Sequence, residues 1–192
     1  MIKTYLAGPD VFHPEAVKLG QLKRDICARY GLDGLFPLDN ELNIQGMAHR
    51  EASFAIYSAN VAMVQRADCV IANLTPFRGA SADAGTIWEL GFACGMGLPC
   101  FGYSMTRNGY ADRARAHKDR MGADDTIIEN FGLTENLMIY WPVEPNGLVL
   151  GDSDDPFPPL DGPLDADLAI FEACVSLAAE RLAGSGPAQA RG

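Results

Sequence analysis

The sequence predicts one α/β domain, built on a parallel sheet of about five strands with helices on both faces. Short apolar runs alternate with segments in which apolar residues recur at helical spacing, a pattern typical of parallel sheets. A chain of 192 residues with 48% hydrophobic content also suffices for one substantial core. The run at 68–74 is apolar almost throughout, as in strands buried on both faces. We therefore expect a flavodoxin- or Rossmann-like domain over residues 1–183 and a flexible tail at 184–192.

The first third of the chain is expected to form two strands and two helices. A strand at Ile2–Ala7 is followed by a helix that Pro14 opens and that ends near Gly31, because helices favour proline just inside the start and glycine past the end. The expected apolar positions of this helix are Val17, Leu22 and Ile26. A short second strand is predicted at 34–38. A second helix is predicted at about 50–66, with Phe54, Tyr57, Val61 and Val64 at helical spacing.

The remaining chain continues the alternation. The apolar run at 68–74 is the expected central strand. Asp83 is a plausible N-cap for a helix that runs to about Met96 and stops at Gly97, and a fourth strand is predicted at 98–103. The charged stretch 107–120 indicates a surface excursion, and the acidic, proline-rich stretch 152–163 an exposed connector. A closing helix is expected at about 165–183.

The composition favours a small uncharged ligand. A formal net charge of −10 works against binding to nucleic acid or an anionic membrane, because such proteins gather Lys and Arg into a patch. Five cysteines, an odd number without a CxxC pair, are expected to be reduced packing residues in a cytoplasmic protein. Neither a signal-peptide pattern nor an apolar run long enough for a membrane span is found. We expect no cofactor and no metal, because His13, His49 and His117 lack metal-ligand spacing.

Glu89 is the only charged residue between Asp83 and Arg107, and it lies in an otherwise apolar run. In open parallel sheets, ligands bind beyond the carboxyl ends of the strands, which here selects the loops “AGPDVFH” and “TPFRGASADAG”. The second loop leads directly into the helix that carries Glu89. One interpretation of Glu89 is a solvated position on a partly exposed helix face. The other is a catalytic carboxylate, with Asp83 either a second carboxyl for glycosyl transfer or a plain N-cap.

Four blocks of sequence carry a resemblance by their order and separation. They are “YLAGPDVF” (5–12), “FPLDNE” (36–41), “NLTPFRGASADAGTIWELG” (73–91) and “ENLM” (135–138). Together they are similar to the nucleoside 2-deoxyribosyltransferase family, with the spacing DxGTxxELG as the most specific part. The similarity extends from the N-terminus to about residue 140. It implies an enzyme that exchanges the base of a 2′-deoxynucleoside for a free nucleobase.

The resemblance also implies roles for three catalytic residues. Glu89 matches the family's nucleophile, which attacks C1′ and leaves a covalent 2-deoxyribosyl enzyme, so that two displacements retain the configuration. Asp83 matches the carboxylate that contacts the leaving or incoming base and takes part in its protonation. Tyr5 matches a tyrosine whose hydroxyl hydrogen-bonds the nucleophile.

Further positions match substrate-binding residues of the family. The implied set is Gly8, Pro9, Asp10, Phe12, Glu41, Asn60, Asn136 and Met138. Asn60 falls where bacterial members have aspartate, and Glu41 where some members have glutamine, so base preference is expected to differ. Asn136 and Met138 match residues that reach into a neighbouring subunit's pocket, which implies a homo-oligomer built from dimers.

Two other functions fit parts of the pattern. A deoxynucleoside 5′-monophosphate N-glycosidase would use the same glutamate with water as acceptor. Its relatives hold the phosphate with serine, arginine and glycines after the first strand, where this chain has “GPDVF” with Asp10; Arg78 is the one residue that favours it. A non-catalytic nucleotide- or flavin-binding module would have no use for Tyr5, Asp83 and Glu89 together.

Overall fold

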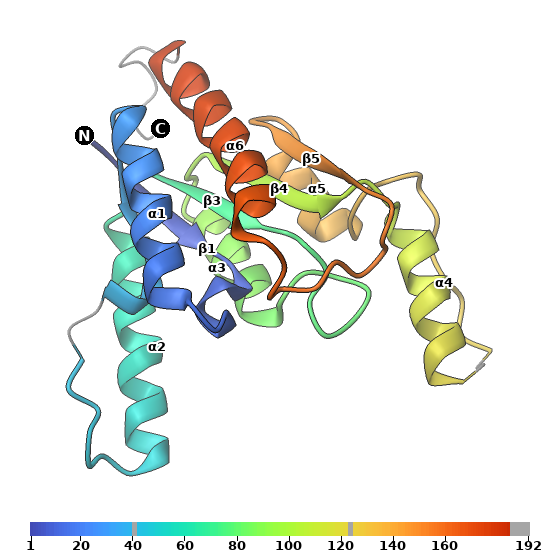
Figure 1. Ribbon diagram of the computed structural model, residues 1–192, viewed down its shortest axis with the longest axis horizontal. Helices are drawn as coiled ribbons and strands as arrows, with labels where there is room; N and C mark the ends of the chain where they lie inside the picture. The colour runs from blue at the N-terminus through green and yellow to red at the C-terminus, as the bar shows by residue number, and fades with distance from the viewer. Residues whose placement is uncertain (40–41, 123–124, 185–192) are drawn as a thin grey trace.

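The computed structural model describes residues 1–39, 42–122 and 125–184, and it contains one five-stranded parallel sheet (Figure 1). The strand order is β2-β1-β3-β4-β5, and all four neighbouring pairs are parallel. The strands are β1 (Ile2–Ala7), β2 (Leu32–Leu35), β3 (Cys69–Asn73), β4 (Cys100–Thr106) and β5 (Leu148–Ser153). The predicted fold class is therefore confirmed, whereas most of the proposed tail lies outside the described residues.

Helices cover both faces of this sheet. Their bounds are α1 (Ala16–Arg29), α2 (His49–Gln65), α3 (Ala84–Gly95), α4 (Tyr110–Met121), α5 (Leu137–Val143) and α6 (Leu164–Gly184). Buried side chains of α1 and α6 share one core with the sheet, and those of α2, α3 and α5 share the other. Helix α4 projects from one end of the molecule, away from both layers (Figure 1). Short 3-10 helices follow β1 at Pro9–Phe12 and β2 at Pro37–Asp39.

The central strand divides its side chains between the two cores. All five residues of β3 are buried, as its continuous apolar sequence predicts. Val70 and Ala72 belong to the core on the α3 side, together with Tyr5 of β1. Cys69 and Ile71 belong to the core on the α1 and α6 side. This alternation places Tyr5 on the face of the sheet that α3 covers.

The termini of α3 are those that the sequence predicts. Asp83 is its N-cap, and the Asp83 carboxylate accepts a hydrogen bond from the Thr86 backbone N–H at 3.1 Å. Gly97 follows the helix with a φ of 76°, in the left-handed region that glycine adopts without steric cost. Because the cap fixes the first turn of α3, it also fixes the position of Glu89 in the second turn of this helix.

Several boundaries differ from the predicted ones. The second strand is Leu32–Leu35, because Pro37 has no N–H for a strand ladder and starts a 3-10 turn. The charged stretch 107–120 is largely helix α4 and contains the buried Arg113, so it is not a mere surface excursion. Strand β5 was not located from the sequence, and its last two residues, Asp152 and Ser153, begin the expected connector.

The amphipathic interpretation of two helices was also partly wrong. In α1, Val17 is 78% exposed, and the charged Lys23 is buried in its place because carboxylates surround it. In α2, Phe54 and Tyr57 are exposed, and Met63 and Val64 form the buried end of the helix. All five cysteines are free, and four of them are buried. Within the described ranges, no helix combines the length and apolar character that crossing a membrane requires.

Candidate active site

Tyr5 and Glu89 meet between β1 and α3. The Tyr5 hydroxyl donates a hydrogen bond of 2.6 Å to Glu89 Oε1, across 84 positions of sequence. Tyr5 is completely buried in the core on the α3 side, so its ring is fixed and its hydroxyl has one direction to point. A hydrogen bond this short to a carboxylate holds the acceptor oxygen in place. The predicted Tyr5–Glu89 pair is therefore present in the structure.

Glu89 has an unusually high pKa for a carboxyl group. Burial is the largest cause that raises this pKa, the charge of Asp83 acts in the same direction, and the pKa of Glu89 rises from 4.5 to about 7 in all. Hydrogen bonds from Tyr5 and from the Asn60 side chain act in the opposite direction, because they favour the carboxylate. The Glu89 carboxyl group therefore titrates close to neutral pH, as a general base or a nucleophile in a partly dry site requires.

Asp83 fits both interpretations that the sequence left open. Its Oδ2 caps α3 by accepting from the Thr86 backbone N–H at 3.1 Å and from the Thr86 hydroxyl at 3.3 Å. Its Oδ1 has no hydrogen bond within the described part of the chain. Asp83 also lies near enough to Glu89 for its charge to disfavour the Glu89 carboxylate. The cap thus leaves one carboxylate oxygen available beside Glu89.

Asn60 lies closer to the nucleophile position than the sequence indicates. The resemblance implies that Asn60 contacts the base, whereas in the structure its side chain hydrogen-bonds Glu89. Helix α2 carries Asn60 and packs beside α3, which carries Glu89. An amide at this position donates to a carboxylate without adding negative charge.

The loop after β1 approaches the end of β3 closely. Gly8 has an extended backbone, and a Cβ atom there would lie 2.9 Å from the Cβ atom of Asn73. Glycine is thus required because the loop after β1 comes close to the end of β3, and not because of an unusual φ. Pro9 is buried and starts the 3-10 helix Pro9–Phe12. These two residues remain predicted substrate contacts.

The side chain of Asp10 points to the other face of the sheet. Asp10 is 4% exposed, and its Oδ1 lies 2.6 Å from Lys23 Nζ of α1. The Asn73 amide also donates to Asp10 Oδ1 at 3.3 Å. Asp10 is therefore not brought together with Tyr5 and Glu89, because its charge is paired below the loop.

Phe12 belongs to an aromatic stack that joins the two loops. Its ring lies 5.4 Å from that of Phe77, at an interplanar angle of 6°. The Arg78 guanidinium lies 5.0 Å from the Phe12 ring centroid and 4.6 Å from that of Phe77. Arg78 has a φ of 54°, an uncommon left-handed conformation for a non-glycine residue. Phe12 is half exposed, so part of its ring is free to contact a ligand.

Asn136 and Met138 stand at the start of helix α5. The Asn136 side chain caps α5 by accepting from the Met138 backbone N–H at 3.0 Å, and its amide donates to Glu129 at 2.7 Å. Met138 is 74% exposed. Met138 is thus open to solvent, whereas the half-buried Asn136 side chain is held within the chain, and the predicted contact of both residues with a neighbouring subunit stays a prediction. Glu41 lies outside the described residues.

Sequence reasoning missed a buried ion pair that supports the loop before Asp83. Arg113 of α4 donates to Glu135 Oε2 at 2.6 Å and to the Ala80 carbonyl oxygen at 2.8 Å. Glu135 in turn accepts from the Ser81 hydroxyl at 2.7 Å. Arg113 and Glu135 are almost fully buried. Nothing in the charged stretch 107–120 indicates that Arg113 is buried in an ion pair. Its partner Glu135 does lie in the “ENLM” block that carries the family resemblance.

No metal centre is found in the part of the chain that the structure describes. Three or more His, Cys, Asp or Glu side chains are nowhere grouped there as ligands. The groups that the structure brings to Glu89 are the Asp83 carboxylate, the Tyr5 phenol and the Asn60 amide.

A family model described as nucleoside 2-deoxyribosyltransferase matches residues 4–138, which is more than half of the chain. The chain belongs to the nucleoside 2-deoxyribosyltransferase family. Tyr5, Asp83 and Glu89 all lie within the matched residues.

Solved structures agree with this membership. A 2-desoxiribosyltransferase from Leishmania mexicana is 27% identical, with a TM-score of 0.56, over 90% of this chain and 98% of its own. A conserved protein from Enterococcus faecalis V583 is 20% identical, with a TM-score of 0.54, over 90% of this chain and 98% of its own, and it supports the fold alone.

A similar sequence is also found in yeast. An uncharacterized protein from Schizosaccharomyces pombe is 33% identical over 122 residues. That match spans 62% of this chain and 58% of the yeast protein.

Proposed function

We propose that this protein is a nucleoside 2-deoxyribosyltransferase that exchanges the base of 2′-deoxynucleosides through a covalent 2-deoxyribosyl intermediate on Glu89. The observation that carries the proposal is the 2.6 Å hydrogen bond from Tyr5 to Glu89, in a chain of this family. A carboxylate whose pKa is about 7 is both ionised in part at neutral pH and a strong enough base to attack an electrophilic carbon.

The first half-reaction would use the Glu89 oxygen that is not engaged by Tyr5. This oxygen attacks C1′ of the sugar, the bond between C1′ and the base nitrogen breaks, and the electron pair leaves with the base. The departing base takes up a proton, and in this proposal the Asp83 carboxyl group delivers or relays it through Oδ1, the oxygen that does not cap α3. Tyr5 keeps the attacking carboxylate oriented throughout this step.

The second half-reaction reverses these roles with another base. A nitrogen of the incoming base attacks C1′ from the face that the first base left, the bond to Glu89 breaks, and the base loses a proton. Two inversions give net retention. The apolar neighbours of Glu89 on α3, such as Leu90, limit the water that would otherwise capture the sugar.

The proposed substrate is a neutral 2′-deoxynucleoside, with a free nucleobase as acceptor. The half-exposed Phe12 ring offers a stacking surface for a base. Gly8, Pro9 and Asn60 complete the proposed contacts of this chain, and Asp10 acts indirectly by fixing the loop through Lys23. The five free cysteines support a reducing compartment such as the cytoplasm.

A homo-oligomer built from dimers is part of the proposal. Met138 is 74% exposed at the start of α5, where a residue that completes a partner's site would be accessible, and Asn136 stands beside it as the cap of that helix. Three aromatic side chains of α2 and α3 also lie at the surface, Phe54, Tyr57 and Trp88, and the half-buried Phe92 stacks on Trp88. Exposed apolar patches of this kind mark protein contacts. A single-subunit mass by light scattering in a fully active sample would contradict the oligomer.

Chromatography of three incubations tests the activity. Deoxyinosine with adenine and thymidine with adenine should each yield deoxyadenosine, whereas a control without acceptor should yield little free base. Free base without new nucleoside would instead identify a hydrolase. A second test quenches the protein with a 2′-fluoro-substituted deoxynucleoside, which slows breakdown of the intermediate. Mass spectrometry should place the sugar adduct on the peptide that contains Glu89, and Glu89→Ala should fold normally and lose the adduct and the activity.

The N-glycosidase acting on 5′-monophosphates remains the alternative candidate, and Arg78 is the observation that favours it. Its guanidinium lies over Phe12 and Phe77 at the loop edge, without an ion pair in the described part of the chain. Deoxynucleoside monophosphates in the same assay decide between the two. Arg78→Gln should leave nucleoside transfer unchanged if the substrate lacks a phosphate.

A further inference from the structure

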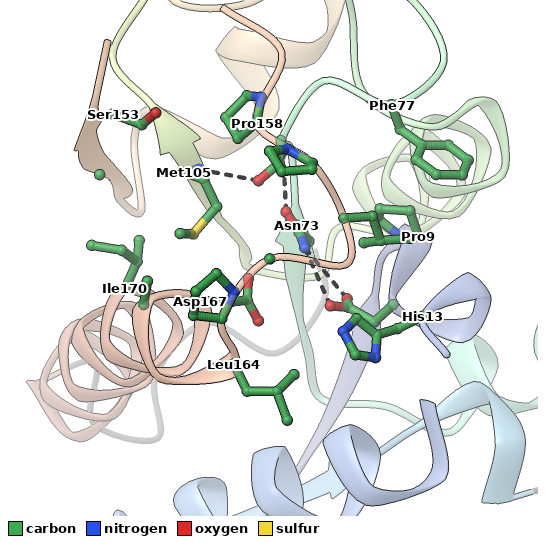
Figure 2. Close-up of a pocket in the computed structure, with 18 of the residues that line it drawn as sticks. Pro9, His13, Asn73, Phe77, Met105, Ser153, Pro158, Leu164, Asp167 and Ile170 are labelled. Carbon is green, nitrogen blue, oxygen red and sulfur yellow. Dashed lines mark hydrogen bonds between the residues drawn. The ribbon is translucent and has the colours of Figure 1, made fainter. Parts of the chain in front are cut away.

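The loop between β3 and α3, residues 74–83, is anchored at both of its ends. At its start, the Asn73 side chain accepts from the Thr75 backbone N–H at 3.1 Å (Figure 2). The Thr75 hydroxyl in turn accepts from the Met105 backbone N–H of β4 at 3.1 Å. The far end of the loop leads into Asp83, the N-cap of α3, and different groups hold it.

A buried ion pair anchors this far end. Glu135 Oε1 accepts from the Ser81 hydroxyl at 2.7 Å, and the Ala82 backbone N–H also donates to the Glu135 carboxylate. Arg113 Nη2 lies 2.6 Å from Glu135 Oε2, and Arg113 Nε donates to the Ala80 carbonyl oxygen at 2.8 Å. The three residues that precede the N-cap of α3 are therefore all bonded to one ion pair.

The same ion pair holds the start of α5. Glu135 Oε1 also accepts from the Asn136 backbone N–H at 2.9 Å. Arg113 Nη1 donates to the Thr134 carbonyl oxygen at 2.8 Å. Asn136 is the N-cap of α5, and its side chain accepts from the Met138 backbone N–H at 3.0 Å. Two helix caps from separate parts of the sequence thus depend on one carboxylate.

Burial gives this network a single geometry. Glu135 is 3% exposed and Arg113 is 1% exposed, so water does not replace their hydrogen bonds if the network opens. Hydrogen bonds between ionised groups are short and directional. A buried ion pair nevertheless contributes little stability compared with apolar side chains of the same size. The distinctive effect of the pair is therefore to fix the positions of the segments that it joins.

We propose that Glu135, held by Arg113, is a positioning residue for both Asp83 and Asn136. It acts on Asp83 through loop residues 80–82 and on Asn136 through the backbone N–H of that residue. The part of Asp83 in base departure and that of Asn136 in substrate binding rest on the proposed function. Because Asn136 is expected to serve a neighbouring subunit's pocket, one ion pair would align groups of two sites.

The test replaces the ion pair with apolar side chains, in Arg113→Met/Glu135→Leu. This double change removes the hydrogen bonds of both side chains and leaves no unpaired charge, so much of the stability should be kept. A purely structural role is then compensated, whereas a positioning role is not. Arg115→Met/Glu144→Leu makes the same two changes at exposed positions of α4 and at the C-cap of α5, and it is the matched control.

The first measurement is amide hydrogen exchange, followed by NMR in the protein without substrate. The Thr86 N–H bonds to the Asp83 cap and the Met138 N–H bonds to the Asn136 cap, so both report on a cap and neither bonds to Glu135. We expect both amides to exchange roughly five- to tenfold faster in the double variant, as the loss of a cap predicts.

The reference amide is Val70, which donates to the Pro99 carbonyl oxygen within the sheet. Its exchange should change much less than that of the two cap amides. The control Arg115→Met/Glu144→Leu should leave all three amides as in wild type. Equal acceleration at Val70, Thr86 and Met138 would indicate a general loss of stability and would overturn the proposal, as would unchanged exchange at both caps.

The second measurement is steady-state transfer. We expect kcat/KM of the double variant to fall about 10- to 100-fold, because small displacements of aligned groups slow a reaction by such factors. The turnover number should fall because Asp83 serves base departure, and KM should rise because Asn136 binds substrate. Wild-type kinetics together with faster exchange at the caps would contradict the positioning role.

Ser81→Ala separates the two arms and decides if the double variant does not fold. It removes the hydroxyl that ties the loop to Glu135 and leaves the ion pair and the bond to Asn136 in place. Exchange at Thr86 should therefore be faster and kcat lower, with little change at Met138 or in KM. Ser53→Ala makes the same change at an exposed position of α2 and should have no effect.

Unchanged Thr86 exchange and unchanged kcat in Ser81→Ala would overturn the proposed arm to Asp83. The absence of transfer by the wild-type protein would instead refute the proposed function. The exchange measurement needs no activity, so it still decides in that case whether Glu135 holds the two caps. The failure of this proposal and that of the proposed function are thus distinguishable.

Discussion

Replacing Glu89 with glutamine should abolish transfer and at the same time stabilise the fold above neutral pH. Burial raises the pKa of the Glu89 carboxyl group to about 7, so the folded state holds its proton more tightly than the unfolded chain does. The stability that comes from the protonated form is fully present below pH 4.5 and is lost as pH rises through about 7. Glutamine resembles the protonated acid in shape and never ionises, so the variant avoids this loss.

The size of the effect follows from the pKa difference. A rise from 4.5 to about 7 spans about 2.5 pH units, and each unit corresponds to about 1.4 kcal/mol. The full conversion gives about 3 kcal/mol, and partial exposure of Glu89 reduces it to about 2–3 kcal/mol. For a chain of this length, that difference is about 5–10 °C in melting temperature.

Thermal unfolding of both proteins at pH 5 and pH 8 measures this difference. The melting temperature of Glu89→Gln relative to wild type should be clearly higher at pH 8 than at pH 5. Glu180→Gln makes the same chemical change on an exposed turn of α6 and should show no such dependence. If the difference between Glu89→Gln and wild type is the same at both pH values, Glu89 is not desolvated and the argument for a perturbed carboxylate is wrong.

Three further predictions concern the supports of the site. Transfer by wild type should increase as pH rises through about 7, and Tyr5→Phe should move the midpoint of that pH–rate profile upward by about one unit, because it removes a hydrogen bond that favours the Glu89 carboxylate; an unmoved midpoint would contradict this. Arg113→Met should lower the free energy of unfolding by about 3–5 kcal/mol in denaturant titrations, because Glu135 is left buried and unpaired, and adding Glu135→Leu should recover much of the loss. Asn136→Ala should weaken substrate use by about tenfold in steady-state kinetics without dissociating the oligomer, and unchanged kinetics would remove Asn136 from the site.

The sequence was sufficient to predict the fold class and the pair at its centre. Apolar runs and helix caps are local signals, so β1, β3 and the limits of α3 lie close to their predicted places. A single carboxylate in an apolar run is also a local signal, and it pointed to Glu89. Its partner Tyr5 lies 84 positions away, and only the family resemblance implied that contact.

What the sequence could not predict are charges whose partners come from distant elements. Periodicity placed Val17 in the core of α1, yet Val17 is exposed. Lys23 is among the buried residues of this helix, because Asp10 and Asp167 approach it from the β1 loop and α6. The family resemblance implied a substrate contact for Asp10, and nothing local shows that its partner Lys23 lies beneath the loop. Arg113 and Glu135 likewise read as surface charges until both sides of the pair are placed in space.

Glu89 illustrates how the fold reconciles two opposed needs of the proposed reaction. Excluding water protects a covalent sugar intermediate, yet the same burial disfavours the carboxylate that must form it. The hydrogen bonds from Tyr5 and Asn60 counter that cost, because neither adds a negative charge. An aspartate in place of Asn60 would add such a charge when ionised and raise the pKa of Glu89 further. The amide at this position therefore keeps Glu89 ionisable near neutral pH, as the proposed transfer requires of a nucleophile in a largely buried site.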